Sequence, residues 1–257
     1  MDPGQPNEIE RPRSVAQLIA EALDMYQDHP LLFLTLALGV IAPYQLIVLA
    51  ATGQGPLASG THENVGLSYL LLLLEVILIS PLVSALHIHA VAVIGRGDQP
   101  RLGDVALRAL KVLPVVVAAV IVSAFLTALG FIALIVPGVL LTLGWAVVAQ
   151  VAAIEHEGWM PSLQRSRELT RGHYWHIFWL LLVTGLLAGG LKLAVAVIPL
   201  GSSSGAASVA VGILTYTLTA SFSALTLALL YYDLRGRRCT NALAPPEPPE
   251  QQPPDPD

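Results

Sequence analysis

The sequence has few charged residues for its length. Asp, Glu, Lys and Arg make up 12% of the 257 residues, whereas 54% are hydrophobic. A soluble globular domain carries roughly 25% charged residues, so this shortage excludes a surface that water solvates on all sides. The 13 basic and 18 acidic residues give a formal charge of −5, and without a basic excess nothing indicates nucleic-acid binding.

Cysteine is nearly absent, and motifs of catalysis are scarce. Cys239 is the single cysteine, which excludes an intrachain disulfide, and no set of Cys and His residues has the spacing of a zinc site. The sequence contains no His-Glu-x-x-His pair and no Gly-x-x-x-x-Gly-Lys phosphate-binding loop. We therefore expect no catalytic residues, no metal site and no cofactor, and a protein that is not an enzyme.

Long hydrophobic runs take the place of charge. A hydrocarbon core of about 30 Å requires about 20 apolar residues in a helix, and six segments approach or exceed this length. Together they contain two formally charged residues, Glu75 and Lys192. We predict an all-α fold, a polytopic membrane helical bundle with six transmembrane helices. The predicted spans are Leu31–Ala50, Gly66–Ile94, Val112–Val136, Gly138–Ile154, His176–Ile198 and Ala206–Tyr232.

The positions of the basic residues predict the orientation in the membrane, because short cytoplasmic loops are enriched in Lys and Arg. The 51–65 loop, the Pro137-Gly138 pair, which is typical of a tight turn, and the 201–205 loop contain no basic residue and are expected to face outward. We predict a multi-pass protein of the plasma membrane with both termini in the cytoplasm. The basic residues on the cytoplasmic side are Arg11, Arg13, Arg96, Arg101, Arg108, Lys111, Arg165, Arg167, Arg171, Arg235, Arg237 and Arg238.

Amphipathic segments precede three of the spans on this predicted cytoplasmic side. Apolar residues from Val15 to Tyr26 follow the spacing of one helix face, and those from Leu102 to Leu113 repeat the same offsets. A weaker copy runs from Trp159 to Tyr174. The pattern predicts two or three interfacial amphipathic helices. It indicates either a true internal repeat or a general property of loops that enter a membrane.

The two ends of the chain differ in composition from the membrane domain. Residues 1–13 carry acidic residues where a signal peptide would be basic, so the first span is expected to remain in the mature protein. Residues 239–257 are rich in Pro and acidic residues, and a segment of this composition cannot bury a core. We predict disordered tails at 1–13 and 239–257 around a six-span membrane domain at 14–238.

Three stretches carry a resemblance to a known family. They are Ile135–Val139, Glu157–Trp175 with its Arg-Ser-x-x-Leu-Thr-x-Gly block, and Tyr231–Arg235. These residues resemble the membrane domain found beside glycerophosphoryl diester phosphodiesterases, and related stand-alone six-span proteins of the bacterial inner membrane. The resemblance covers roughly residues 14–238. It implies a membrane module without phosphodiesterase activity, because hydrolysis in that family belongs to a separate soluble barrel for which this chain has no room.

Glu75 is the strongest candidate for a functional residue, since a carboxylate within a hydrophobic span is costly. Lys192 lies at a similar expected depth in the fifth span, about 10 Å from its outer edge against about 13 Å for Glu75. Three interpretations remain open. The two residues form an ion pair, or Lys192 extends outward while Glu75 is protonated, or Glu75 binds a proton or a substrate.

The basic cluster before the fifth span is a candidate site for lipids. Arg165, Arg167 and Arg171 either only fix the topology or contact anionic lipid headgroups, with each near-surface charge adding about 1 kcal/mol. Trp175 and its aromatic neighbours are typical of the interfacial belt of a membrane protein. We therefore name Arg165, Arg167, Arg171 and Trp175 as headgroup candidates.

Histidines near the inner ends of two spans raise the question of a metal. His87 and His89 are two residues apart, so on a helix they point about 200° away from each other and cannot chelate one ion together. Either could combine with Glu155, His156 or Glu157. Interfacial histidines that only form hydrogen bonds are commoner, and we predict no metal ligand among them.

Together these observations favour a non-catalytic accessory or lipid-associated membrane module, with membrane lipids as partners and any protein partner left open. The alternative is a small-molecule transporter or channel that uses Glu75, for which a water-accessible cavity reaching Glu75 is required. A third possibility is an intramembrane lipid enzyme, which requires a nucleophile and a base within hydrogen-bond reach.

Overall fold

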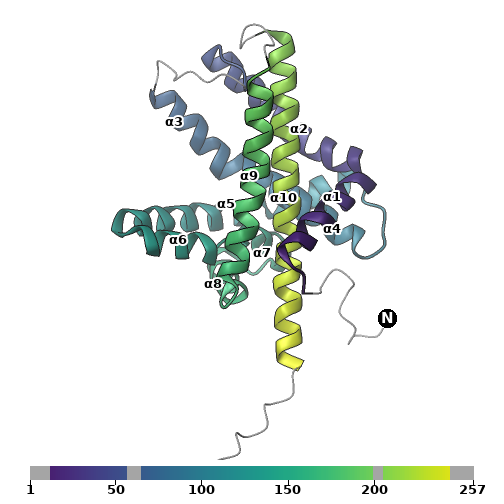
Figure 1. Ribbon diagram of the computed structural model, residues 1–257, viewed down its shortest axis with the longest axis vertical. Helices are drawn as coiled ribbons and strands as arrows, with labels where there is room; N and C mark the ends of the chain where they lie inside the picture. Colours follow the sequence, from purple (N-terminus) through teal and green to yellow (C-terminus); the bar gives the residue numbers. More distant parts are fainter. Residues whose placement is uncertain (1–11, 57–64, 199–204, 244–257) are drawn as a thin grey trace, which may run out of the picture.

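The computed structural model describes residues 12–56, 65–198 and 205–243, which are almost entirely helical (Figure 1). No strand occurs in these three ranges, which confirms the all-α prediction. The helices are α1 (Val15–Asp28), α2 (Pro30–Thr52), α3 (Val65–Leu74), the π-helix η1 (Glu75–Ile79), α4 (Ser80–Ile94), α5 (Leu102–Ala133), α6 (Ile135–Gly144), α7 (Val148–Glu155), α8 (Trp159–Thr170), α9 (Tyr174–Ala196) and α10 (Ala206–Leu243).

Six helical stretches in the described part of the chain are long and apolar enough to cross a membrane. Each of them overlaps one of the six hydrophobic segments identified in the sequence, and four of the six contain the predicted segment completely. By the length and composition of its helices, the chain is a multi-pass membrane protein. The stretches are Pro30–Thr52, Val65–Ile94, Leu102–Ala133, Ile135–Glu155, Tyr174–Ala196 and Ala206–Thr240.

The second stretch is not one uniform α-helix. A single π-helical turn, η1, separates α3 from α4 and begins at Glu75. Pro81 follows within two residues of this turn, and in a regular α-helix its ring would collide with the carbonyl of Ile77, four residues earlier. The widened turn relieves that conflict. It also sets Glu75 at an irregular point of the helix, and such points are frequent at functional sites.

The hairpin between α5 and α6 turns at Leu134, whose extended backbone separates the two helices. The expected turn at Pro137-Gly138 is therefore three residues too late, because Pro137 lies in the first turn of α6, where its missing N–H costs no hydrogen bond. Gly130 and Gly138 lie close to each other across the hairpin. Gly138 has no room for a side chain, since a Cβ there would lie 2.5 Å from the Phe131 ring. The two glycines allow the helices to touch along their backbones.

Two of the three predicted amphipathic segments form separate helices. α1 begins with a capping box in which the Ser14 hydroxyl accepts from the Gln17 N–H, and it buries Leu18 and Ala22. α8 is the separate third segment. The second segment is helical as expected, but it continues without a break into the third span, so α5 is a single helix of 32 residues.

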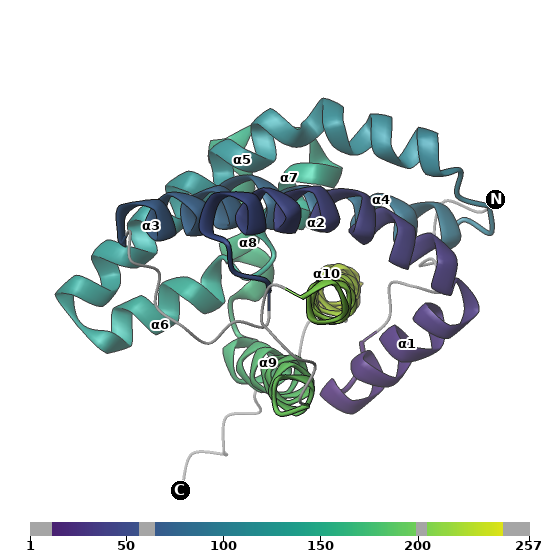
Figure 2. The same cartoon turned by 90° about the horizontal axis from the view of Figure 1, so that it is seen from above.

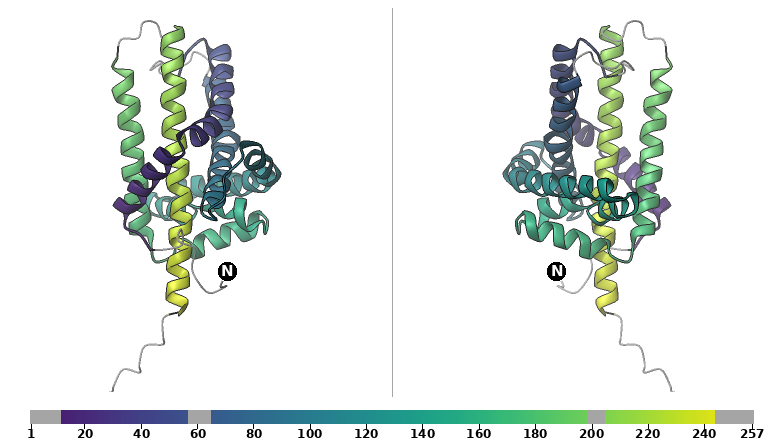
Figure 3. Two further views of the ribbon diagram at one scale, coloured as in Figure 1. Left: turned by 90° about the vertical axis from the view of Figure 1, so that its right-hand side faces the viewer. Right: turned by 90° about the vertical axis from the view of Figure 1, so that its left-hand side faces the viewer.

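The helices run in two main directions. α9 and α10 lie side by side along the long axis of the molecule, whereas α5 and α6 run across it (Figures 1 and 3). Viewed from above, α9 and α10 are seen end-on while α5 and α6 are seen lengthwise (Figure 2). α10 is central and packs against α2, α4 and α9, and the main hydrophobic core extends from Leu18 in α1 to Leu234 in α10.

The start and the end of the described chain are tied together by buried charges. The Arg13 N–H donates to Asp233, and the Arg237 guanidinium donates to Asp233 at 2.8 Å and to the Arg13 carbonyl. His176 approaches the same carboxylate at 3.5 Å. Burial, together with the nearby Arg237 charge, lowers the pKa of His173, which keeps this neighbouring imidazole neutral near pH 7. The two ends of the described chain therefore lie on one face, which we call the terminal face.

The ordered part of the chain is longer at both ends than the sequence suggests. Arg13, which we assigned to the N-terminal tail, is buried. α10 continues to Leu243, and Cys239 is an exposed residue of this helix rather than part of a tail. The remaining tail predictions, for residues 1–11 and 244–257, lie outside the described residues.

Candidate functional site

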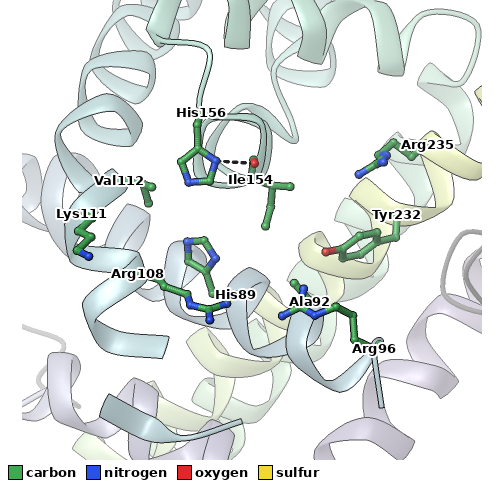
Figure 4. Close-up of a pocket in the computed structure, with 11 residues that line it drawn as sticks. His89, Ala92, Arg96, Arg108, Lys111, Val112, Ile154, His156, Tyr232 and Arg235 are labelled. Atoms are coloured by element: carbon green, nitrogen blue, oxygen red, sulfur yellow. Dashed lines mark hydrogen bonds between the residues drawn. The ribbon is translucent and has the colours of Figure 1, made fainter. Parts of the chain in front are cut away.

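An open cavity of about 550 Å³ lies on the terminal face, where α4 and α7 end and α5 begins. Its walls carry four basic side chains, Arg96, Arg108, Lys111 and Arg235, and none of the described residues that line it is a carboxylate. Figure 4 shows Arg108 and Lys111 on one side of the cavity, with Arg96 and Arg235 on the other. We call this the cationic cavity. The residues that line it are His89, Ala92, Gly95, Arg96, Arg108, Lys111, Val112, Ile154, His156, Tyr232 and Arg235.

Two of the four basic residues of the cationic cavity have no carboxylate partner among the described residues. Arg108 and Lys111 have no carboxylate within 4.0 Å anywhere in the described ranges. Arg96 has one distant and solvent-exposed partner, Asp98, at 3.7 Å. Arg235 donates to the Tyr231 hydroxyl at 3.4 Å. The charges of Arg108 and Lys111, which have no such carboxylate partner among the described residues, favour the binding of an anion.

Two imidazoles form the floor of the cationic cavity. The rings of His89 and His156 have centroids 6.4 Å apart and meet between the basic residues (Figure 4). His156 shares a hydrogen bond of 2.7 Å between its Nδ1 and the Ile154 carbonyl, and its backbone is left-handed, with φ of 55°. A left-handed conformation in a residue other than glycine is uncommon and is found at functional sites.

His89 provides an unsatisfied polar atom in this site. The residue is 6% exposed, and its buried Nε2 has no hydrogen-bond partner. Leaving a buried polar atom without a partner costs roughly 1–3 kcal/mol, so a bound ligand or water that pairs with Nε2 would be stabilised. The cavity thus combines uncompensated positive charge with a hydrogen-bonding position that the protein leaves open.

The headgroup candidates on α8 and α9 lie in a different environment. Arg165 forms salt bridges of 3.3 Å with both Glu155 and Glu168, and the Arg167 guanidinium lies over the Trp145 ring at 5.8 Å. Arg171 and Trp175 are exposed. Two of the three arginines therefore already have partners within the protein. We call Arg165, Arg167 and Arg171 the α8 cluster.

Glu75 and Lys192 contact aromatic residues. Glu75 accepts a hydrogen bond of 3.3 Å from the Tyr44 hydroxyl, and the Lys192 ammonium lies 4.3 Å from the centre of the Tyr216 ring. The two charges are near enough to interact electrostatically, but no carboxylate–ammonium distance between them is 4.0 Å or less. A functional ion pair stays a prediction.

Glu75 also lines two separate cavities. One, of about 220 Å³, lies toward the face opposite the termini and includes Tyr44 and Gln54. The other, of about 120 Å³, extends between α2, α4 and α10 and includes Ser84 and Ser223. The Gln54 Oε1 is buried without a hydrogen-bond partner. The carboxylate therefore borders one mainly polar cavity and one mainly apolar cavity.

His87 is engaged on both ring nitrogens and cannot act as a metal ligand without losing these bonds. Its Nδ1 lies 2.8 Å from the Val83 carbonyl and its Nε2 lies 2.7 Å from the Ser221 hydroxyl. Glu155 is held by Arg165 and Tyr231. Within the three described ranges, no three His, Cys, Asp or Glu side chains are grouped so that they could hold a metal ion.

The cationic cavity is the part of the site that sequence reasoning missed. Each of its four basic residues was interpreted as a topological charge, and His89 and His156 were considered only as metal ligands. The available signal was the recurrence of basic residues near the ends of three helices, α4, α5 and α10. The sequence could not reveal that these ends converge on one volume.

Comparison of the chain with models of protein families, with curated proteins and with solved structures found no match.

Proposed function

We propose that this multi-pass membrane protein is a non-catalytic, lipid-associated module that binds a phosphate-bearing anionic headgroup in the cationic cavity. The observation that supports this is the convergence of four basic residues on one cavity, in which Arg108 and Lys111 have no carboxylate within 4.0 Å among the described residues. Guanidinium groups bind phosphate oxygens through paired hydrogen bonds, and such charge-assisted bonds are roughly twice as strong as neutral ones.

The position of the cavity favours a lipid over a soluble ligand. It lies where the apolar stretches Val65–Ile94 and Leu102–Ala133 meet at the terminal face, which is the level of the headgroups when these helices lie in a bilayer. Positive charge at this level attracts anionic lipids. Under the positive-inside rule this face is cytoplasmic in a plasma membrane, and that orientation is part of the proposal.

Native mass spectrometry with defined lipids tests the proposal. The purified protein is mixed with phosphatidylglycerol, with phosphatidylcholine, or with inorganic phosphate. We expect a phosphatidylglycerol adduct that the Arg108→Gln, Lys111→Gln double variant weakens at least tenfold. The matched control, Arg165→Gln with Arg167→Gln, removes the same charge from the same face and should retain the adduct.

Three outcomes would contradict parts of the proposal. Equal losses in both double variants would mean that the basic residues act only through total charge, which contradicts a built site. Binding of inorganic phosphate without any phosphatidylglycerol adduct would assign the cavity to a soluble anion and overturn the lipid-associated function. No anion bound by the wild-type protein would refute the site itself.

Transport of a small molecule or of protons is the second candidate, because Glu75 borders a cavity on either side of it. A carboxylate that borders two cavities within a membrane-spanning stretch is a candidate for passing a proton from one to the other. Proton flux into liposomes that contain the protein should fall at least tenfold in Glu75→Gln and remain unchanged in Glu157→Gln, a control at an exposed carboxylate. Equal flux in all three proteins would eliminate this candidate.

A further inference from the structure

The α5–α6 hairpin is short on one side for a structure that crosses a membrane. The stretch Ile135–Glu155 reaches a crossing length only together with α7, and a turn at residues 145–147 separates α7 from α6. α6 itself contains ten residues from Ile135 to Gly144, which at 1.5 Å per residue extends about 15 Å. The hydrocarbon core is about 30 Å thick. A chain that starts at one boundary of the core therefore reaches its middle, at most, by the Leu134 turn.

The end of α6 is bound to α8, the helix that precedes α9. The Gly144 carbonyl accepts hydrogen bonds of 3.1 Å from both Ser166 and Thr170 of α8. α8 is the polar helix that carries the α8 cluster, and it leads into the first residue of α9, Tyr174. Because these bonds hold Gly144 against α8, α6 ends at the level at which α9 begins.

The direction of the hairpin shortens its reach further. α5 and α6 lie across the axis that α9 and α10 follow, and the view from above shows them lengthwise (Figures 1 and 2). Helices in this direction run along the plane of a bilayer that α9 and α10 cross. The Leu134 turn is therefore displaced sideways, away from the central helix α10, and not toward the opposite face.

The tip of the hairpin has the surface of a segment embedded in lipid. Leu134 is 70% exposed and Ile132 81% exposed, with Ile135 and Val136 beside them. The Leu134 N–H donates to the Gly130 carbonyl at 3.0 Å, and the Leu134 carbonyl accepts from the Gly138 N–H at 3.3 Å. A turn within hydrocarbon requires such internal bonds, since no water is available there.

We propose that α5 and α6 form a re-entrant hairpin that lies in the leaflet on the side of the termini and that does not cross the membrane. Its partners are the acyl chains of that leaflet. The protein then crosses the membrane four times, through α2, the α3–η1–α4 stretch, α9 and α10. Both termini remain on the same side, as in a six-span topology, so that the location of the termini does not distinguish the two arrangements.

Spin-label depth measurements in lipid nanodiscs distinguish them. In a Cys239→Ser background, a single label is placed at Ile135 by Ile135→Cys, and its depth is read from relaxation by oxygen and by a water-soluble nickel complex. Trp175→Cys at the start of α9 and Ile198→Cys just beyond its end calibrate the two boundaries. We expect the label at Ile135 to lie in hydrocarbon, closer to the Trp175 level than to the Ile198 level.

Labelling from outside gives a second, independent readout. In membranes that expose the face opposite the termini, an impermeant maleimide should modify Ser203→Cys but not Ile135→Cys. A label at the Ile198 level, or modification of Ile135→Cys as efficient as that of Ser203→Cys, would overturn the re-entrant hairpin. Ile132→Cys, on the other side of the turn, repeats both measurements if Ile135→Cys does not fold.

Discussion

The cationic cavity and the α8 cluster lie on the same face and carry similar numbers of basic residues, but they differ in their partners. Arg165 is bound by two glutamates and Arg167 lies over Trp145. Arg108 and Lys111 have no carboxylate within 4.0 Å in the described part of the chain. From the sequence we named the α8 cluster, and not the residues of the cationic cavity, as the candidate for lipid headgroups.

The difference shows that counter-charges decide what a group of basic residues can do. An arginine that is already paired must break a salt bridge before it binds an external anion, so its net gain is small. An arginine that faces a space without carboxylates gains the full interaction. In the function we propose, Arg165 and Arg167 therefore contribute to the fold, whereas the cationic cavity binds the anion.

Charge reversal should produce the largest difference in lipid binding between variants of the cationic cavity and variants of the α8 cluster. Arg108→Glu combined with Lys111→Glu should weaken binding of phosphatidylglycerol about 100-fold, because charge-assisted hydrogen bonds of about 1.5–3 kcal/mol are lost. Arg165→Glu should weaken it less than threefold. Lipid titration followed by native mass spectrometry measures both constants, and similar losses at the two sites would remove the distinction.

The same question applies to Glu75 and Lys192, namely how far each charge is neutralised by the other. If the two charges stabilise each other, the Glu75→Gln, Lys192→Gln double variant should be more stable than the sum of the single variants predicts, by about 1–3 kcal/mol. Thermal unfolding in detergent measures this coupling. Additive single effects would show that Tyr44 and Tyr216 hold the two side chains independently.

Removing a counter-charge should convert part of the α8 cluster into a binding surface. Glu155→Gln takes one carboxylate from Arg165, and the freed charge should strengthen the adsorption of the protein's terminal face to anionic lipid about fivefold, equivalent to about 1 kcal/mol per near-surface charge. Glu157→Gln is the matched control, since this exposed carboxylate has no salt bridge among the described residues. Equal effects of the two substitutions would contradict the role of pairing.

The smallest effect is expected from Arg165→Gln. Its salt bridges are partly exposed, with 39% of the arginine side chain accessible, and exposed pairs contribute about 0–1 kcal/mol. The free energy of unfolding should fall by less than about 1 kcal/mol, measured by chemical denaturation in detergent. A loss above about 2 kcal/mol would show that Arg165 is a structural anchor of α8.

The sequence predicted the helices well because hydrophobic length and periodicity determine them locally. The stretches around Leu31–Ala50 and Ala206–Tyr232 became α2 and α10, and the spacing from Val15 to Tyr26 became α1. The turn of the α5–α6 hairpin was misplaced, since Pro137-Gly138 is typical of a turn but is equally suited to the first turn of a helix.

The arrangement of the helices could not be predicted in the same way. Whether Arg96, Arg108 and Arg235 converge depends on how α4, α5 and α10 pack, and this depends on contacts between residues far apart in the sequence. The π-helical turn at Glu75 is a further example. Pro81 indicates a disturbance of the helix, but not that the extra width places Glu75 between two cavities.

The re-entrant hairpin has a consequence for the shape of the surrounding membrane. Four helices occupy equal areas in both leaflets, whereas α5 and α6 add their cross-section to the leaflet beside the termini alone. That leaflet must then expand relative to the other, and the relaxed bilayer around the protein bends so that the expanded leaflet is on the convex side. The protein should therefore concentrate where the membrane is curved in this sense, and it should do so without any partner protein.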